Sequence, residues 1–492
     1  MSGWTRAFAL IFCGVAAAAG QAPLGWWFVA LPAFAVAIAL IAGANRPFLS
    51  GWLFGTAHFA AALHWIVEPF FVDAAATGWL ALPALVAVAA GLALFWGVAG
   101  GIGRRAGGSL GVALALALAE LARSYVLTGF PWALPGHVLI ASPALPAASF
   151  AGAHGLTLAV LAGAGLMAYR HLGAVALGLA VWTLPFALAL TLPPAPVADP
   201  GAQRVRLVQP NAPQHLKWDP AWMPIFFTRG LDATAAPSDG PVPDAVIWPE
   251  TALPALLRDS DDLRATIAAA SGGTPVVIGA QRYDAAGRPR NTMVVLDGAE
   301  GAIGTIHDKH RLVPFGEYLP LPRLFGAVGL GPLAAQLAGG YAPGDGPALV
   351  EVPGLGSVLP LICYEAIFPQ DLRRVDRPRA LLHLTNDAWF GTFAGPFQHL
   401  SLARLRAAES GLPLLRAANT GVSAMIDARG AIVAQIGLGQ TGHLDVAVPT
   451  AFAPTPYQRM GDGPVGLLTL ILLVGIAAWS RGKAVEGRGE HP

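Results

Sequence analysis

The chain has 492 residues, of which 55% are apolar and only 12% charged, and its formal net charge is +1. This charged fraction is about half that of ordinary soluble proteins, so we expect part of the chain to lie in lipid. A near-neutral charge argues against a nucleic-acid partner, and two cysteines in very different surroundings, Cys13 and Cys363, imply no disulfide framework.

Charge is distributed unevenly along the chain. Residues 1–200 contain only six Lys or Arg, whereas most of the remaining charge lies between 203 and 429. The chain therefore divides into a lipid-soluble half and a water-soluble half.

Seven apolar stretches of near-spanning length precede residue 195, and an eighth lies near the C-terminus. The first continues at once into the second, which is typical of an uncleaved signal anchor. The eighth is short, about 24 Å at 1.5 Å per residue, but a locally thinned bilayer would accommodate it. We expect spans at about 7–24, 26–44, 49–71, 77–102, 108–128, 150–169, 172–193 and 464–479.

The positions of the cations predict the orientation of these spans. With a cytoplasmic N-terminus, Arg46, the Arg104–Arg105 pair and Arg170 all fall in inward loops, and only Arg123 is out of pattern. We therefore predict a multi-pass protein of a bacterial inner membrane. Its predicted parts are a seven-helix membrane domain (1–195), a periplasmic domain (196–463), a last transmembrane helix (464–480) and a cytoplasmic tail (481–492).

Two charges interrupt the fifth stretch. Glu120 and Arg123 are three residues apart and so share one helix face, where pairing lowers the cost of placing charge in or near lipid. A structural ion pair and a substrate contact both fit this pattern.

Beyond the Pro-rich linker 192–196 the pattern changes to short strands alternating with amphipathic segments, which predicts one layered α/β domain. No GxGxxG motif, Walker loop or zinc-spaced Cys/His cluster occurs, so we expect no cofactor and no metal. The predicted strands are 204–209, 244–248, 275–280, 292–296, 303–307, 358–362, 380–385 and 414–417, and the predicted helices are 219–236, 259–271, 367–375 and 396–411.

Three chemically distinctive residues each follow the end of a predicted strand. Glu250 follows 244–248, Lys309 follows 303–307, and Cys363 follows 358–362. The carboxyl ends of strands in α/β sheets meet at the crevice where ligands bind. A carboxylate can take a thiol proton, an ammonium can stabilise an oxyanion, and the backbone N–H of Tyr364 can be a second oxyanion donor, so the sequence predicts a Glu-Lys-Cys site for acyl transfer.

Each residue also has a simpler interpretation. Cys363 could be a small buried hydrophobe, Glu250 a solvated or capping acid, and Lys309 a surface charge. The three together fit the catalytic interpretation better, because the sequence around them is also distinctive.

The flanking motifs resemble a known family. Trp248-Pro249-Glu250, Asp308-Lys309 and Cys363-Tyr364-Glu365 resemble the signatures of the nitrilase, or carbon–nitrogen hydrolase, superfamily. The longer stretches resemble its apolipoprotein N-acyltransferase family over nearly the whole chain. These stretches are 216–219, 248–254, 312–320, 386–391 and 416–421.

The resemblance implies a fold, a set of roles and two substrates. It implies a nitrilase-like α-β-β-α sandwich joined to eight transmembrane helices. It makes Glu250 the general base, Lys309 the oxyanion stabiliser and Cys363 the nucleophile, with support from Trp218, Glu317, Tyr364 and Glu365. The implied donor is a membrane phospholipid and the implied acceptor is the N-terminal amine of a diacylglyceryl-modified apolipoprotein, with an acyl-thioester between them.

Two other functions fit parts of this pattern. A membrane-tethered nitrilase-type amidase would use the same triad and pass its acyl group to water, and a transporter or scaffold would have a degenerate outer domain. The triad cannot separate the acyltransferase from the amidase, so the distinction depends on Trp218, the membrane half and the apolar, Gly-containing segment between Phe315 and Pro343. We expect this segment either to dip into lipid as a lid or to pack on the helical half.

Overall fold

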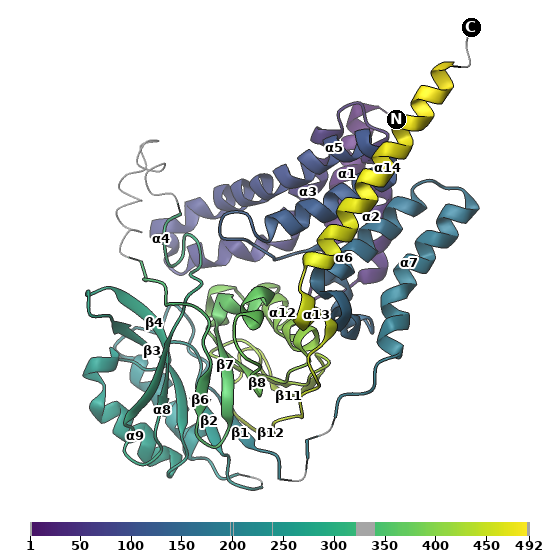
Figure 1. The fold of residues 1–492 in the computed structure, drawn as a ribbon. Helices are drawn as coiled ribbons and strands as arrows, with labels where there is room; N and C mark the ends of the chain where they lie inside the picture. The colour runs from purple at the N-terminus through teal and green to yellow at the C-terminus, as the bar shows by residue number, and fades with distance from the viewer. Residues whose placement is uncertain (1, 197, 200, 239, 321–339, 490–492) are drawn as a thin grey trace.

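The computed structural model describes residues 2–196, 198–199, 201–238, 240–320 and 340–489. Two parts lie one against the other: a bundle of apolar helices and a two-sheet α/β domain (Figure 1). The last helix, α14, leaves the α/β domain and runs back along the bundle (Figure 1).

Helices occupy all seven apolar stretches of the first half. Their bounds are α1 Gly3–Ala18, α2 Trp27–Ala42, α3 Pro47–Ala62, η1 His64–Phe71, α4 Ala74–Thr77, η2 Gly78–Leu80, α5 Ala81–Arg123, η3 Pro135–Leu139, η4 Leu145–Ala147, α6 Ala148–Met167 and α7 Leu172–Leu190. The stretch predicted at 49–71 is an α-helix only as far as Ala62 and then continues as the 3₁₀ segment η1.

Two predicted spans form one bent element. α5 (Ala81–Arg123) runs through most of 77–102 and of 108–128, and Gly107 and Gly108 depart from helical geometry between the two. Gly108 has φ +63°, which a residue without a Cβ adopts at no steric cost. Within the described residues, four helical segments are long and apolar enough to cross a membrane: Ala74–Arg123, Leu145–Met167, Leu172–Leu190 and Gly463–Gly482.

The α/β domain has two six-stranded sheets. Their orders are β12-β1-β2-β3-β4-β5 and β11-β10-β9-β8-β7-β6. The strands are β1 Arg204–Gln209, β2 Ala245–Ile247, β3 Val276–Tyr283, β4 Pro289–Leu296, β5 Ile303–Asp308, β6 Val350–Val352, β7 Gly356–Ile362, β8 Ala380–Thr385, β9 Leu414–Ala418, β10 Ser423–Ile426, β11 Ile432–Ile436 and β12 Gly442–Ala447.

The domain is a four-layered sandwich. α8 (Met223–Ala235) and α9 (Asp261–Ser271) cover the first sheet through a core that includes Trp248 and Ile267. The inner faces of the two sheets meet through residues such as Val205 and Leu382. α12 (Gly395–Ser410) covers the second sheet. This is the expected α-β-β-α arrangement.

The helical bundle and α12 share one apolar core. Tyr364, Phe368 and Leu405 belong to the same buried cluster as Phe34 and Trp96 of the bundle. The chain then passes through α13 (Pro456–Met460) into α14 (Gly463–Gly489). The layer formed by α12 and η6 (Cys363–Ile367) is thus packed directly on the helical bundle.

The structure differs from the sequence-based predictions at one predicted helix and at four strands that were not predicted. The segment predicted as a helix at 367–375 is instead two 3₁₀ turns, η6 (Cys363–Ile367) and η7 (Pro369–Arg373), separated by an extended Phe368. Proline disfavours helical geometry in the residue before it, which explains the break. β6, β10, β11 and β12 were not predicted. Residues 321–339, the centre of the predicted lid, lie outside the described residues.

Candidate active site

The three residues predicted at strand ends converge on one buried place. Glu250 lies three residues beyond β2, Lys309 directly follows β5, and Cys363 directly follows β7. Their exposed fractions are 5%, 1% and 5%. Electrostatic coupling of the Cys363 thiol to both Glu250 and Lys309 places the three groups in one site.

Hydrogen bonds hold both oxygens of the Glu250 carboxylate. Oε1 accepts from Nδ2 of Asn291 at 2.7 Å and lies 3.5 Å from Nζ of Lys309. Oε2 accepts from the backbone N–H of Asn386 at 2.8 Å. The carboxylate is therefore oriented from both sheets, because Asn291 lies on β4 and Asn386 follows β8.

Lys309 is paired more closely with a second acid. Its Nζ donates to Oε1 of Glu317 at 2.7 Å, and Oε2 of Glu317 accepts from the backbone N–H of Val313 at 2.8 Å. Burial opposes the charge of Lys309, but Glu317 and Glu250 outweigh this effect and raise its pKa well above its usual value. The site therefore contains a permanent cation.

The Cys363 side chain is a thiol when the site is at rest. Burial raises its pKa far above the usual value, the Glu250 carboxylate raises it further, and Lys309 opposes the shift. Because thiols react as thiolates, the proton has to leave as the sulfur attacks. A neighbouring carboxylate is the group that such a step requires.

Glu365 ties the strand carrying the thiol to the loop carrying the lysine. Its Oε2 accepts from the backbone N–H of Ile362, and its Oε1 accepts from the N–H groups of His310 and Arg311. Fully buried, Glu365 thus fixes the end of β7 against the residues just beyond Lys309. These hydrogen bonds give a structural basis for the role in support of the triad that the family resemblance implied for Glu365.

One cluster near the site has the residue types of a metal centre. Donor atoms of His307, His310 and Glu365 lie within 4.8 Å of one another. Burial opposes protonation of His310, but Asp371 and Glu365 raise its pKa to about 9, and its Nδ1 lies 2.7 Å from Oε1 of Glu365. In this structure His310 and Glu365 therefore form an ion pair within the cluster.

The two predicted aromatic residues differ in burial and contacts. Tyr364 is 6% exposed, and its hydroxyl donates to the carbonyl of Gly129 in the helical half at 3.4 Å. Trp218 is 44% exposed and lines a shallow pocket together with Thr251.

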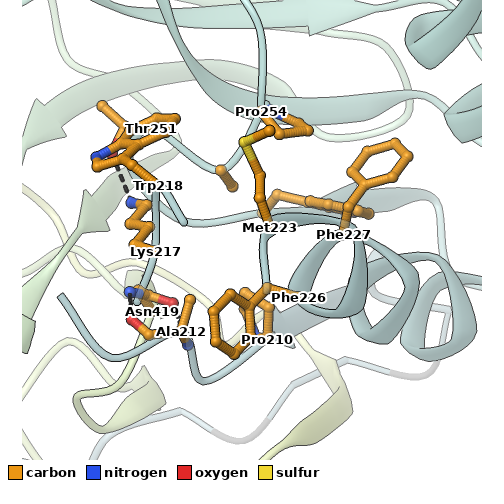
Figure 2. A pocket seen from close by; sticks show the side chains of 12 residues that line it. Pro210, Ala212, Lys217, Trp218, Met223, Phe226, Phe227, Thr251, Pro254 and Asn419 are labelled. Atoms are coloured by element: carbon orange, nitrogen blue, oxygen red, sulfur yellow. Dashed lines mark hydrogen bonds between the residues drawn. The ribbon is translucent and has the colours of Figure 1, made fainter. Parts of the chain in front are cut away.

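This pocket, shown in Figure 2, has an apolar wall and one polar edge. Met223, Phe226 and Phe227 supply apolar surface, while Nζ of Lys217 donates to Oγ1 of Thr251 at 2.7 Å. Burial lowers the pKa of Lys217 to about 8.

Sequence reasoning assigned no role to Asn291 or Asn386, although both contact Glu250. Asn386 directly follows β8, so the strand-end pattern that singled out the triad applied to it as well. Asn291 lies inside β4, where no local pattern distinguishes it from its neighbours.

The arrangement suits acyl transfer through a covalent intermediate. It combines a protonated thiol, an oriented carboxylate and a fixed ammonium in a buried place, and the first backbone N–H groups of η6 are not bonded within the helix. A tetrahedral intermediate on the sulfur would be flanked by donors for its oxyanion.

Comparison with known proteins gives a consistent assignment. Residues 227–454 match the carbon-nitrogen hydrolase family, and residues 13–166 match the apolipoprotein N-acyltransferase N-terminal domain. The chain is 40% identical to the apolipoprotein N-acyltransferase of Caulobacter vibrioides, over 97% of this chain and 96% of that protein. It is 37% identical to the one from Rhodopseudomonas palustris, over 96% and 95%. Among solved structures, an amidase from Nesterenkonia sp. aligns with 18% identity and a TM-score of 0.37, over 55% of this chain and 97% of that one.

Proposed function

The chain belongs to the apolipoprotein N-acyltransferase family, and from that premise we propose how its own residues carry out the transfer. Cys363 takes a fatty acyl chain from a membrane phospholipid and holds it as a thioester. This acyl group is then transferred from Cys363 to the N-terminal amine of the diacylglyceryl-cysteine of an apolipoprotein. The product is a triacylated lipoprotein.

The first half-reaction forms the thioester. Glu250 takes the thiol proton as the sulfur of Cys363 bonds to the ester carbonyl carbon. The tetrahedral intermediate collapses by breaking the carbon–oxygen ester bond, and Glu250 returns the proton to the leaving alkoxide. A lysophospholipid departs with its hydroxyl restored.

The second half-reaction forms the amide. The free amine attacks the thioester carbon and loses a proton to Glu250. The carbon–sulfur bond then breaks, and the thiolate of Cys363 regains the proton. A thioester is activated enough to acylate an amine, so two feasible steps replace one slow transfer.

Lys309 and the backbone N–H of Tyr364 stabilise the oxyanion in both halves. Lys309 suits this role because it stays charged while lying 3.5 Å from the base. Glu317 holds the lysine, Glu365 holds the loop around it, and Trp218 forms part of the wall that handles substrate.

The apolar helices and the family indicate a membrane protein, which suits two proposed substrates anchored in a bilayer. Eight spans, a bacterial inner membrane and a periplasmic α/β domain fit the distribution of Arg along the first half. A reporter fused after Pro196 should give a periplasmic signal, and a cytoplasmic signal would overturn this topology.

The observation that carries the mechanism is the buried Glu250–Lys309 pair facing a protonated thiol. Purified protein incubated with phospholipid alone should gain one acyl chain on the peptide containing Cys363, as read by mass spectrometry. Later addition of a diacylated lipopeptide should remove the adduct and yield the N-acylated peptide.

The same experiment separates this function from an amidase. Release of free fatty acid without N-acylated peptide would assign the acyl group to water. Absence of any adduct in the first incubation, with active transfer in the second, would defeat the covalent mechanism.

A further inference from the structure

The backbone of Cys363 has a conformation that side chains other than glycine seldom adopt. Its φ is +52°, in the left-handed region, at the junction between β7 and η6. Such a conformation is strained and persists only when its surroundings hold it. The contacts around its carbonyl show how it is held.

Two buried imidazoles meet the carbonyl oxygen of Cys363. Nε2 of His383 lies 3.2 Å from this oxygen, and Nε2 of His399 lies 3.1 Å from it. Both rings are fully buried, and they stand edge to face at a centroid distance of 4.9 Å. We call this pair, His383 and His399, the histidine clamp.

Strand alternation places the clamp behind the active site. On β8, Leu382 and Leu384 face the core between the two sheets, so His383 faces the opposite layer with Leu381. His399 reaches the same layer from α12. The carbonyl of Cys363 thus lies toward α12, away from the inter-sheet core where the thiol lies.

The neighbours of His383 determine which of its ring nitrogens carries hydrogen. The guanidinium of Arg416 approaches Nδ1 of His383 at 2.8 Å, and a guanidinium can only donate. Nδ1 is therefore an acceptor, and Nε2 carries the hydrogen that it donates to Cys363.

His399 is placed by an acid instead. Its Nδ1 lies 2.8 Å from Oδ1 of Asp387. Burial opposes ionisation of Asp387, but Arg416 and His399 outweigh this effect and lower its pKa to about 2. Burial lowers the pKa of His399, although Asp387 opposes this effect, and the ring contacts Asp387 through Nδ1 and the Cys363 carbonyl through Nε2.

Fixing this carbonyl also fixes the next N–H. The peptide bond between Cys363 and Tyr364 is trans, so the Tyr364 N–H lies opposite to the clamped oxygen. A donor on this oxygen also polarises the amide and strengthens its N–H as a donor.

We propose that His383 and His399 are positioning residues, which hold the Cys363 carbonyl and thereby aim the Tyr364 N–H at the oxyanion. This rests on the proposed function, because it takes Cys363 as the nucleophile.

The helical half forms one wall of the clamp. The ring of Trp132 packs against His399 at 5.7 Å, and Phe390 lies against the same ring at 5.7 Å. The adjacent Gln398 accepts from Nε1 of Trp132 at 2.7 Å and of Trp65 at 3.1 Å. Trp132 and Trp65 of the helical half therefore contact the part of α12 that carries His399.

Matched amide variants test the clamp. Gln can offer an N–H near the position of Nε2, whereas the shorter Asn reaches only the position of Nδ1 and leaves the Cys363 carbonyl without that donor. We expect His383→Asn and His399→Asn each to lower the single-turnover rate of thioester formation about 10- to 100-fold. We expect His383→Gln and His399→Gln to stay within about fivefold of the unaltered protein.

A second reaction at the same sulfur distinguishes orientation of the oxyanion donor from general damage. Alkylation of Cys363 by iodoacetamide forms no oxyanion, so its rate should change less than threefold in all four variants. The clamp is supported if the Asn variants lose the rate of acylation but keep the rate of alkylation. Equal loss in both reactions, or equal behaviour of Asn and Gln variants, overturns it.

Failure of the clamp can be told from failure of the mechanism. If the unaltered protein forms a Cys363 adduct and the Asn variants form it at the same rate, only the clamp is wrong. If the unaltered protein forms no adduct, the proposed nucleophile itself is wrong. Should an Asn variant not fold, a Gln variant that folds yet loses acylation selectively also contradicts the proposal.

Discussion

Each half of the molecule buries a glutamate beside a cation, and the two sites differ in how completely the carboxylate is paired. In the helical half, Oε1 and Oε2 of Glu120 lie 3.0 Å and 2.5 Å from nitrogens of Arg123, and Nε1 of Trp96 donates to Oε1 at 2.6 Å. In the α/β half, Glu250 lies 3.5 Å from Lys309, which is held more closely by Glu317.

The difference teaches what each charge does. In a two-pronged Arg–carboxylate pair both carboxylate oxygens are hydrogen-bonded to the guanidinium. Such a carboxylate is not placed to accept a proton from a reacting group. Glu250 has a looser cation and faces a thiol whose proton it can accept. We interpret Glu120 as a structural group and Glu250 as a reactive one.

Loss of the nucleophile should have the largest effect. Cys363→Ala removes the sulfur that carries the acyl chain, so we expect transfer to fall by at least about 1,000-fold. Mass spectrometry after incubation with phospholipid should find no adduct, while the unfolding temperature stays close to that of the unaltered protein. Sustained transfer by this variant would assign the chemistry to another residue.

Loss of the base should come next. Glu250→Gln keeps the shape but cannot accept the thiol proton, so we expect thioester formation to slow by about 100- to 10,000-fold. Single-turnover kinetics measure this step. Near-normal rates would mean that another group deprotonates Cys363.

Loss of the cation should follow. Lys309→Met removes the ammonium while keeping the apolar stem, and the loss of one oxyanion donor costs about 100- to 1,000-fold in rate. The variant leaves Glu317 without its cationic partner. The double variant Lys309→Met/Glu317→Gln, which removes this unpaired charge, is therefore the matched control for folding. Unaltered turnover in Lys309→Met would reject the assigned role.

The helical pair should respond in stability rather than in chemistry. Glu120→Gln leaves Arg123 buried without its counter-charge, which costs about 3–5 kcal/mol of folding free energy. Thermal unfolding in detergent measures this, with the double variant Glu120→Met/Arg123→Met as the control expected to recover part of the loss. A variant that unfolds normally but no longer acylates would instead make Glu120 a substrate contact.

The smallest effect concerns pH. Asp371 and Glu365 raise the pKa of His310 in the folded protein to about 9, above the value of about 6.5 for an unfolded chain. The stabilisation is therefore complete below about pH 6.5 and disappears as pH rises through about 9. Unfolding temperatures between pH 6 and 9.5 should fall for the unaltered protein and fall less for His310→Gln. Parallel slopes would contradict the pairing.

Much of the architecture was predictable because it rests on local patterns. Long apolar runs predicted the helices of the first half, and all eight predicted strands occur, with β1 and β8 matching their predicted ends. The four missed strands lie at a sheet edge or next to one, and most of β11 and β12 is not fully buried, so these strands need not follow the apolar pattern of a buried strand.

The sequence by itself determined which side chains stand at strand ends, because strand length and the residue that follows a strand are local properties. Glu250, Lys309 and Cys363 were found this way. Only the tertiary structure decided how they are held. Glu250 is oriented by Asn291 and Asn386, which are 41 and 136 residues away along the chain, and the Cys363 carbonyl is held by imidazoles 20 and 36 residues away. Such partners meet through sheet order and layer packing, and no spacing along the chain encodes them.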